Sequence, residues 1–256
     1  MISRWPLPTV AALLLLGSWC LGQQVVQQTP KSANLRTFQA AKDVSDAPAW
    51  PTGEVWAYAF ELGGYKYWIR ADGRGKRTKT GTAPRDFELS LESGDSLEHH
   101  LFYAPHRDGI VLLYEINLGD GGAASIVKLN RQTLRTRWRQ RIPAFNVGRA
   151  LAEGDYAYVT GIGFIGKVNL ILGTYVWQHD DLYRGEDKAP QTRCCHFNSF
   201  ETPRIEGNAV LFEETPEYYL NNLQSIRVDK ESGRILRKGE IPPPEGTPPL
   251  LPHPQN

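Results

Sequence analysis

The stretch from Gly154 to His179, GDYAYVTGIGFIGKVNLILGTYVWQH, determines the fold that we expect for this chain. Its first part, Tyr156 to Thr160, is aromatic and β-branched, which favours a strand. Residues 161–163, Gly-Ile-Gly, give the backbone the freedom to turn back. Phe164 to Leu170 is then the returning strand of a hairpin.

A second turn follows directly, between Asn169 and Gly173. Asn accepts backbone hydrogen bonds in turns, and Gly adopts a positive φ without a steric cost. The next strand, Thr174 to His179, carries Trp177. The stretch therefore predicts three consecutive antiparallel strands.

The second half of this unit has two further copies in the chain. Each copy is a basic residue, an apolar residue and then Asn or Asp: Lys128-Leu129-Asn130, Lys167-Val168-Asn169 and Arg227-Val228-Asp229. Eight positions after the Asn or Asp stand, in the same order, Trp138, Trp177 and Arg237; the turn position holds Leu134, Gly173 and Gly233. The copies are 39 and 60 residues apart. A strand-built repeat of about 40–50 residues is typical of propeller blades.

This pattern resembles the tryptophan-docking repeat of the quinoprotein-like (PQQ-like) β-propeller family. Val168 to Trp177 fits it best and departs only at Leu172, where Thr is usual. The resemblance covers roughly residues 100–240 and implies that the Trp packs between adjacent blades. It implies structural docking roles for Trp138, Trp177, Asn130, Asn169, Asp229, Gly173 and Gly233. Many members of the family are binding scaffolds without a quinone, so the resemblance implies a fold and no particular function.

We therefore expect an all-β protein built from β-propeller-like repeats of four-stranded antiparallel blades. Repeat units begin near residues 54, 99, 148 and 199, which gives about four blades, the usual lower limit for a closed propeller. The first unit is recognised mainly by a hairpin, Val55 to Leu62 and Tyr65 to Arg70 around two glycines. It matches the repeat poorly, so an incomplete or atypical ring is an open alternative.

Four segments are expected along the chain. Residues 1–22 have the order of a signal peptide, with Arg4 before the apolar run Val10 to Leu16 and small residues before a cleavage point after Gly22. Residues 23–50 are expected to be a linker, helical around residues 35–42. The β-propeller-like domain occupies residues 51–241. Residues 242–256 contain seven prolines and are expected to be an extended tail.

The signal peptide predicts a periplasmic or secreted protein with no transmembrane segment in the mature chain, since its apolar run is too short to span a bilayer. A lipid anchor on Cys20 is the alternative, although the bulky Trp19 before it fits a lipoprotein signal poorly. The formal net charge of +1 gives no bulk attraction to nucleic acid. A protein or another component of the cell envelope is therefore the expected partner.

Basic residues gather in two places. The first group is Arg70, Arg74, Lys76, Arg77, Lys79 and Arg85, which is either a solvated loop, the interpretation we favour, or a site for an anionic partner such as a cell-envelope polymer. The second group, Arg135, Arg137, Arg139 and Arg141, alternates along a strand and so shares a face opposite Trp138 and Ile142. There the charges are explained by protection of an outer strand from aggregation.

The sequence assigns no catalytic residue, no cofactor and no metal site. Gly161, Gly163 and Gly166 spell G-x-G-x-x-G, but a dinucleotide fingerprint must open a helix, and the following residues predict strands. The trio His179, Asp180 and Asp181 fits no zinc spacing. We therefore expect an exported binding or assembly module; the alternative is a small quinone- or metal-dependent oxidoreductase of the cell envelope.

Cys194 and Cys195 are the cysteines that remain after removal of the signal. They are free thiols, bridges to other chains or a vicinal disulfide, and the sequence does not decide among the three. Free thiols are poorly suited to an oxidising compartment. A vicinal bridge would be strained but tolerable in the insertion that lengthens one repeat spacing, and mass measurement with alkylation before and after reduction distinguishes the three states.

Overall fold

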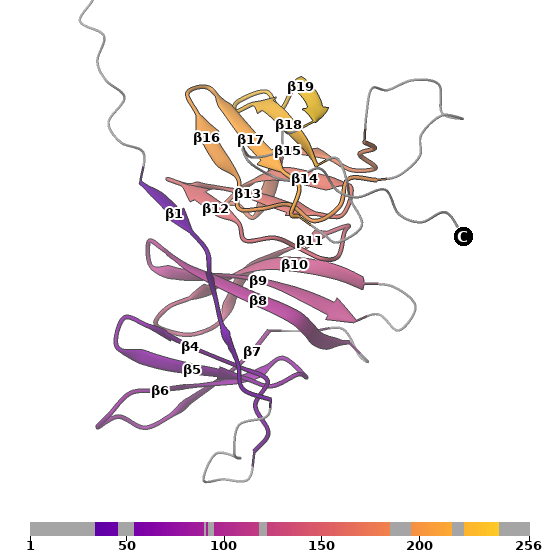
Figure 1. The fold of residues 1–256 in the computed structure, drawn as a ribbon. Coiled ribbons are helices and arrows are strands. Elements are labelled where there is room, and N and C mark those ends of the chain that lie inside the picture. The colour runs from indigo at the N-terminus through magenta and orange to yellow at the C-terminus, as the bar shows by residue number, and fades with distance from the viewer. Residues whose placement is uncertain are drawn as a thin grey trace, which may run out of the picture. The chain divides into compact units, whose positions relative to one another are not determined.

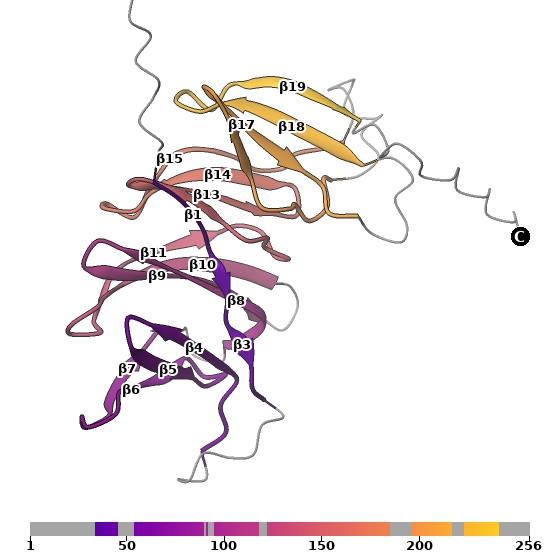
Figure 2. The ribbon, with the colours of Figure 1, turned by 60° about the vertical axis from the view of Figure 1, so that its left-hand side comes forward.

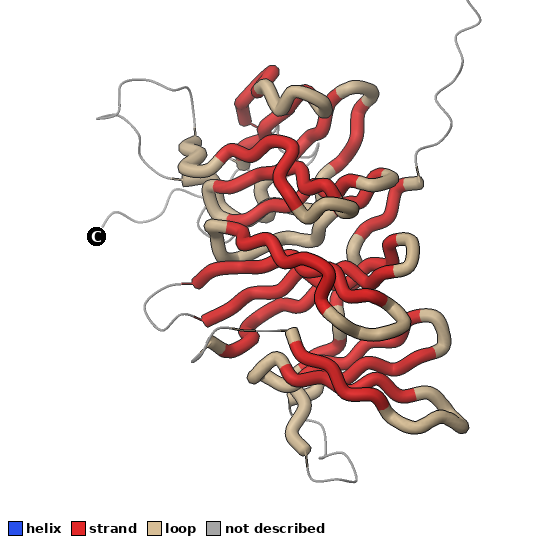
Figure 3. The backbone as a smooth tube through the Cα atoms, turned by 180° about the vertical axis from the view of Figure 1, so that it is seen from behind, coloured by secondary structure: helices blue, strands red, loops and turns tan. Residues whose placement is uncertain are grey.

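The computed structural model describes residues 34–45, 54–89, 91, 95–117, 122–184, 196–216 and 223–240. Within these residues every regular element is a strand, as the tube in Figure 3 shows. None of the described elements is a helix that could cross a membrane. The predicted signal peptide with Cys20, the pair Cys194 and Cys195, and the Pro-rich tail lie outside the described residues.

The strands form four antiparallel sheets. The first sheet has the order β3 (Lys42–Asp43), β4 (Tyr58–Leu62), β5 (Tyr65–Ile69), β6 (Arg74–Thr78) and β7 (Arg85–Glu88). The second has β2 (Gln39–Ala40), β8 (Ser96–His106), β9 (Gly109–Asn117), β10 (Gly122–Asn130) and β11 (Thr136–Ile142). The third has β1 (Leu35–Thr37), β12 (Leu151–Glu153), β13 (Tyr156–Gly161), β14 (Phe164–Asn169) and β15 (Thr174–His179). The fourth has β16 (Arg204–Glu206), β17 (Ala209–Glu213), β18 (Gln224–Asp229) and β19 (Ile235–Glu240).

The sheets follow one another in chain order, face to face, from the purple first sheet to the yellow fourth sheet in Figure 1. Each neighbouring pair encloses an apolar layer, and each interior sheet contributes opposite faces to two layers. In β9, for example, Leu112 packs towards the first sheet and Leu113 towards the third. Strand alternation explains this arrangement, because successive side chains point to opposite faces. Strands that are buried on both faces have nearly continuous apolar sequences, as β9 has.

The stack is not closed into a ring, and its two end sheets turn charged faces outward. In β6 the buried residues Gly75 and Arg77 alternate with the exposed Arg74, and in β18 the buried Val228 follows the exposed Arg227. Terminal repeats of open arrays need such polar outer faces to stay soluble. Four antiparallel sheets were predicted, and the all-β repeat fold is confirmed, with an open arrangement instead of a closed ring.

Residues 34–45, which we call the strap, run along one edge of three sheets (Figure 2). Within the strap, β1 pairs with β12, β2 with β8 and β3 with β4, all antiparallel. Phe38 is buried between the second and third sheets. The helix expected around residues 35–42 is therefore wrong. These short polar segments become strands because sheet edges offer unpaired N–H and C=O groups to them.

Candidate functional site: a basic cleft between the first two sheets

The three copies of the repeat build the same turn. The side-chain oxygen of Asn130 accepts the N–H groups of Gln132 and Thr133, that of Asn169 accepts Ile171 and Leu172, and that of Asp229 accepts Glu231 and Ser232, at 2.8–3.2 Å. The turn then ends in a left-handed residue, with φ of 63° at Leu134, 76° at Gly173 and 75° at Gly233. This conformation suits glycine and strains Leu134.

Two tryptophans lie directly on the turn glycines of the next sheet. A Cβ atom on Gly173 would stand 2.5 Å from the Trp138 ring, and one on Gly233 would stand 2.5 Å from the Trp177 ring. Trp177 also donates its indole N–H to the carbonyl of Lys230 at 3.1 Å. Only a residue without a side chain leaves room for such a contact, so each Trp–Gly pair fixes the spacing between two sheets.

The basic residue of the repeat makes a second contact between sheets. It pairs with the docking Trp of the neighbouring strand in its own sheet. Its side chain donates to a carbonyl in the turn of the next sheet, that of the residue directly after the Asn or Asp. Lys128 donates to Leu170 at 3.2 Å and Lys167 donates to Lys230 at 2.9 Å. Both lysines are buried, with 3% and 1% of their surface exposed. In the first sheet Arg77 takes this part and donates to Arg131 at 2.5 Å.

Among the described residues, the boundary between the first and second sheets has no docking tryptophan. Arg85 pairs with Arg77, in the place where Trp138 pairs with Lys128 and Trp177 pairs with Lys167. Its guanidinium donates to the carbonyl of Gln132 at 3.2 Å. A guanidinium does not fill the space of an indole. The groove that Trp138 and Trp177 close at the other two boundaries is therefore open here.

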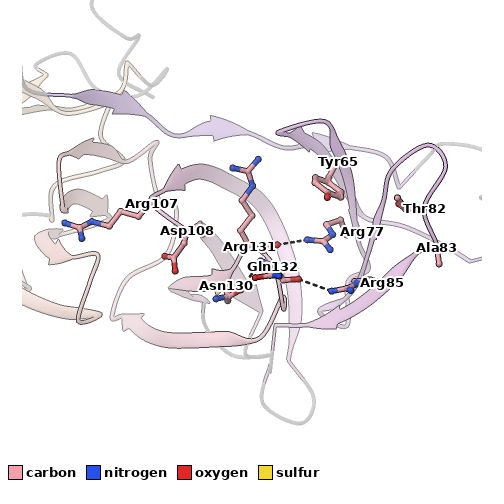
Figure 4. A pocket seen from close by; sticks show the side chains of 10 residues that line it. All are labelled: Tyr65, Arg77, Thr82, Ala83, Arg85, Arg107, Asp108, Asn130, Arg131 and Gln132. Atoms are coloured by element: carbon pink, nitrogen blue, oxygen red, sulfur yellow. Dashed lines mark hydrogen bonds between the residues drawn. The ribbon is translucent and has the colours of Figure 1, made fainter.

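This open groove is a cleft of about 620 Å³ (Figure 4). It is lined by Tyr65, Arg77, Thr82, Ala83, Arg85, Arg107, Asp108, Asn130, Arg131 and Gln132. One wall comes from the first sheet and the other from the Asn130 turn and the β8–β9 turn of the second sheet. The Arg131 side chain extends across the gap to Gly63, and Arg77 stacks over the Tyr65 ring at 4.5 Å. The site thus holds four guanidinium groups, of which two belong to strands β6 and β7 and two to turns of the second sheet.

The cleft is positively charged because its carboxylate is already paired. Asp108 binds Arg137 of β11, and this hydrogen bond lowers the pKa of Asp108 below its usual value. Arg107 is bound by both oxygens of Asp155 in the third sheet. By contrast, Arg77, Arg85 and Arg131 have no carboxylate partner among the described residues. A guanidinium presents five donors in a planar fork that matches phosphate and carboxylate groups.

The structure divides the predicted basic cluster of residues 70–85 between two faces of the first sheet. Arg70 and Arg74 pair with Asp72, and Lys76 pairs with Glu54 at 2.8 Å, on the outer face. The other three, Arg77, Lys79 and Arg85, lie on the side of the cleft, where Lys79 stands 5.1 Å from the Tyr65 ring. The favoured interpretation as a loop is wrong for Arg74 to Thr78 and for Arg85, which belong to β6 and β7.

The second basic group lies on β11, which is the edge strand of the second sheet. The expected single face is interrupted, because a bulge between the pairs Lys128–Trp138 and Leu129–Thr136 places Arg137 out of the alternation. Arg137 turns to Asp108, while Arg139 donates to Ser125 at 3.3 Å on the side away from Trp138.

The trio His179, Asp180 and Asp181 does not converge. His179 contacts the carbonyl of Gly233 at 2.6 Å, whereas Asp181 pairs with His196 at 2.8 Å. Within the described residues there is no group of three His, Cys, Asp or Glu side chains placed to hold a metal ion.

Sequence reasoning missed Arg107, Arg131 and Tyr65 as partners in one site. They come from three turns or strands that are far apart in the chain. One signal was available: the first unit has no Trp at the docking position, which is where the groove opens.

No protein-family model and no curated protein matches the chain by sequence. Solved structures with a similar fold include BamB from Moraxella catarrhalis, with 13% identity, a TM-score of 0.41, and coverage of 69% of this chain and 61% of BamB. A europium-containing methanol dehydrogenase has 12% identity, a TM-score of 0.43, and coverage of 80% and 44%. The quinohemoprotein alcohol dehydrogenase ADHIIG from Pseudomonas putida HK5 has 14% identity, a TM-score of 0.36, and coverage of 54% and 22%.

The matched region therefore spans less than two thirds of each of these structures. They are PQQ-like β-propeller proteins, the family whose repeat this sequence resembles. The likeness is one of fold alone.

Proposed function

We propose that this protein is an exported binding module of the cell envelope that holds an anionic group in the cleft between its first two sheets. The observation that carries the proposal is the presence of Arg85 at the docking position, which leaves an open groove. Within the part of the chain that the structure describes, three arginines of this groove have no carboxylate partner. Of these three, Arg77 is buried, Arg131 is half-buried and Arg85 is exposed. A buried or half-buried cation without a counter-ion is costly unless a ligand supplies the opposite charge, and this applies to Arg77 and Arg131.

The ligand class is a phosphate- or carboxylate-bearing segment of an envelope polymer or protein. Both groups accept paired hydrogen bonds from guanidinium forks. The cleft has room for several such groups in a row, because its volume of about 620 Å³ exceeds the space that a single phosphate needs. Binding should weaken as salt is added, since charged groups at an open site are screened over about 10 Å at 0.1 M ionic strength.

The test is calorimetric titration of the purified protein with linear polyphosphate and, in a separate arm, with polygalacturonate. We expect at least one polymer to bind, and the double variant Arg85→Gln and Arg131→Gln to lose about tenfold or more in affinity, which corresponds to about 1.4 kcal/mol. Neither side chain is buried in the apolar layers, so the variant should keep the far-UV spectrum of the parent.

The control is Arg234→Gln, an exposed arginine directly after the turn of the fourth sheet, at the repeat position that Arg135 holds in the second sheet. It removes one charge far from the cleft and should leave affinity unchanged. Equal losses in the control and the double variant would show bulk attraction instead of a site. Absence of binding by the parent to either polymer would refute the proposal.

A further inference from the structure

The strap shows how this fold accepts an added strand. Leu35 pairs with Glu153, Gln39 with Tyr103 and Lys42 with Ala59, so one short segment supplies a fifth strand to three consecutive sheets. The added strands are exposed on their side chains and are held chiefly by main-chain hydrogen bonds. Backbone pairing of this kind depends little on the identity of most side chains.

The fourth sheet has four strands within the described residues, and β16 lies at the edge that the strap covers in the other sheets. β16 is the structural equivalent of β12. Each has three residues and ends at a glycine with a positive φ, 59° at Gly154 and 62° at Gly207. Each also pairs with the next strand in the same register, Glu153 with Tyr156 and Glu206 with Ala209.

The main-chain groups that the strap uses on β12 have counterparts beside β16. Phe38 donates its N–H to the carbonyl of Ala150 at 2.9 Å, and Pro203 stands at the position equivalent to Ala150. Proline lacks an N–H but retains its carbonyl, which is the group required there. The backbone groups of successive strand residues point to alternate sides. The N–H and C=O of Ala152 point towards the strap, and those of the equivalent Ile205 therefore point away from β17.

The side chains along this edge leave the backbone accessible. Arg204 and Glu206 are exposed, and Ile205 is half-buried. The two charges are already neutralised inside the sheet, by Glu213 at 2.7 Å and Arg227 at 3.5 Å. The charge of an added strand should therefore have little influence on its binding to this edge, and the main chain of β16 is accessible to it.

We propose that β16 is a docking edge for an extended segment of a partner protein, which adds antiparallel as a fifth strand to the fourth sheet. The strap indicates the chemistry of that segment: a few exposed, mostly polar residues, followed by an apolar residue that enters the layer between two sheets, as Phe38 does. This site is separate from the cleft and does not depend on the anion proposal.

The test uses a synthetic peptide with the strap sequence Asn34 to Val44 as the probe, added to the full chain with its own strap in place. Binding is followed by fluorescence anisotropy, and its location by amide exchange of residues 204–207. We expect saturable one-to-one binding and slowed exchange at Ile205. A control peptide, N-methylated at the residues whose N–H groups join the ladder, should bind at least tenfold more weakly, because main-chain donors supply most of the affinity.

Two protein variants complete the design. Ile205→Pro removes the outward N–H and leaves the ladder to β17, and it should lower affinity at least tenfold; Arg204→Ala changes a side chain of the same strand and should bind as the parent does. Equal binding of the two peptides, or unchanged affinity in Ile205→Pro with native spectra, would overturn the proposal. So would the absence of binding to the parent, including the case in which the chain's own residues before Asn34 already cover the edge.

Discussion

Replacement of Trp177 by Ala tests whether tryptophan docking holds the third and fourth sheets together. The Trp177 side chain is 9% exposed, lies on Gly233 and contacts Phe212 and Tyr158 at ring distances of 6.5 and 6.2 Å. A buried aromatic of this size removes roughly 150–250 Å² from water. At about 25 cal/mol per Å² this is worth roughly 4–6 kcal/mol.

Part of that energy is recovered when the surroundings relax into the cavity, and measured truncations of buried aromatics to Ala cost about 3–5 kcal/mol. The lost hydrogen bond to the carbonyl of Lys230 adds about 1 kcal/mol in principle. However, Lys167 still donates to that carbonyl at 2.9 Å, so it does not become an orphan. We therefore expect a loss of about 4 kcal/mol in the free energy of unfolding for Trp177→Ala.

The assay is urea denaturation followed by far-UV circular dichroism, since tryptophan fluorescence changes with the substitution itself. With a slope of about 2 kcal/mol per M, the midpoint should fall by about 2 M. Trp177→Phe keeps the ring on Gly233 and should lose less than half as much. Trp138→Ala should also cost less than Trp177→Ala, because Trp138 is only half-buried and its indole N–H has no partner among the described residues. A Trp177→Ala midpoint equal to that of the parent would refute the docking argument.

Two further predictions concern the turns and the histidine between sheets. Gly173→Ala and Gly81→Ala impose the same backbone strain, because φ is 76° at both positions, but the new Cβ would contact Trp138 at position 173 and nothing within 4 Å at position 81. By denaturation, Gly81→Ala should lower the free energy of unfolding by about 1–2 kcal/mol, and Gly173→Ala should lower it clearly more. Equal losses would contradict the contact with Trp138. His106 is buried between Asp155 at 3.0 Å and the Lys128 amine at 2.9 Å, and burial lowers its pKa below the usual 6.5. Below about pH 6.5 the unfolded chain therefore binds a proton that the folded chain does not. The free energy of unfolding should fall as the pH drops below about 6.5, and the full contribution of His106 should be present above that pH. His106→Gln should flatten this pH dependence, and an unchanged slope in that variant would show that other groups produce it.

Strand positions were predictable wherever strong turn residues bracket an apolar run. The prediction for β15 has the bounds found in the structure, 174–179, because Asn169 fixes the preceding turn. The strap was not predictable in this way. Leu35–Thr37 and Lys42–Asp43 have no periodic pattern, and their partners lie 15–118 residues further along the chain. Edge pairing is a property of the sheet that receives the strand.

For a related reason, only some of the residues of the cleft could be predicted from the sequence. Arg74 and Arg77 are three residues apart in β6, so strand alternation sends them to opposite faces, and a count of charges along the chain merges what the sheet separates. Arg131 joins the site from the other side of the groove through a turn of the second sheet. What the sequence did contain was an irregularity, the absence of a docking Trp in the first unit.

The repeat contacts explain how an open stack of four sheets stays ordered without ring closure. Each boundary is fixed by a basic side chain that reaches the next turn, Arg77, Lys128 or Lys167 in order. Such nearest-neighbour contacts alone would let the stack open at any one boundary. The strap changes this, because one continuous segment pairs with three sheets, so that separating two of them also breaks pairing to the strap. The fourth sheet has no such strand among the described residues. It is held to the third sheet by their shared apolar layer and by contacts such as those of Lys167, Trp177 and His179. We therefore expect the amide hydrogens of the fourth sheet to be the first to exchange.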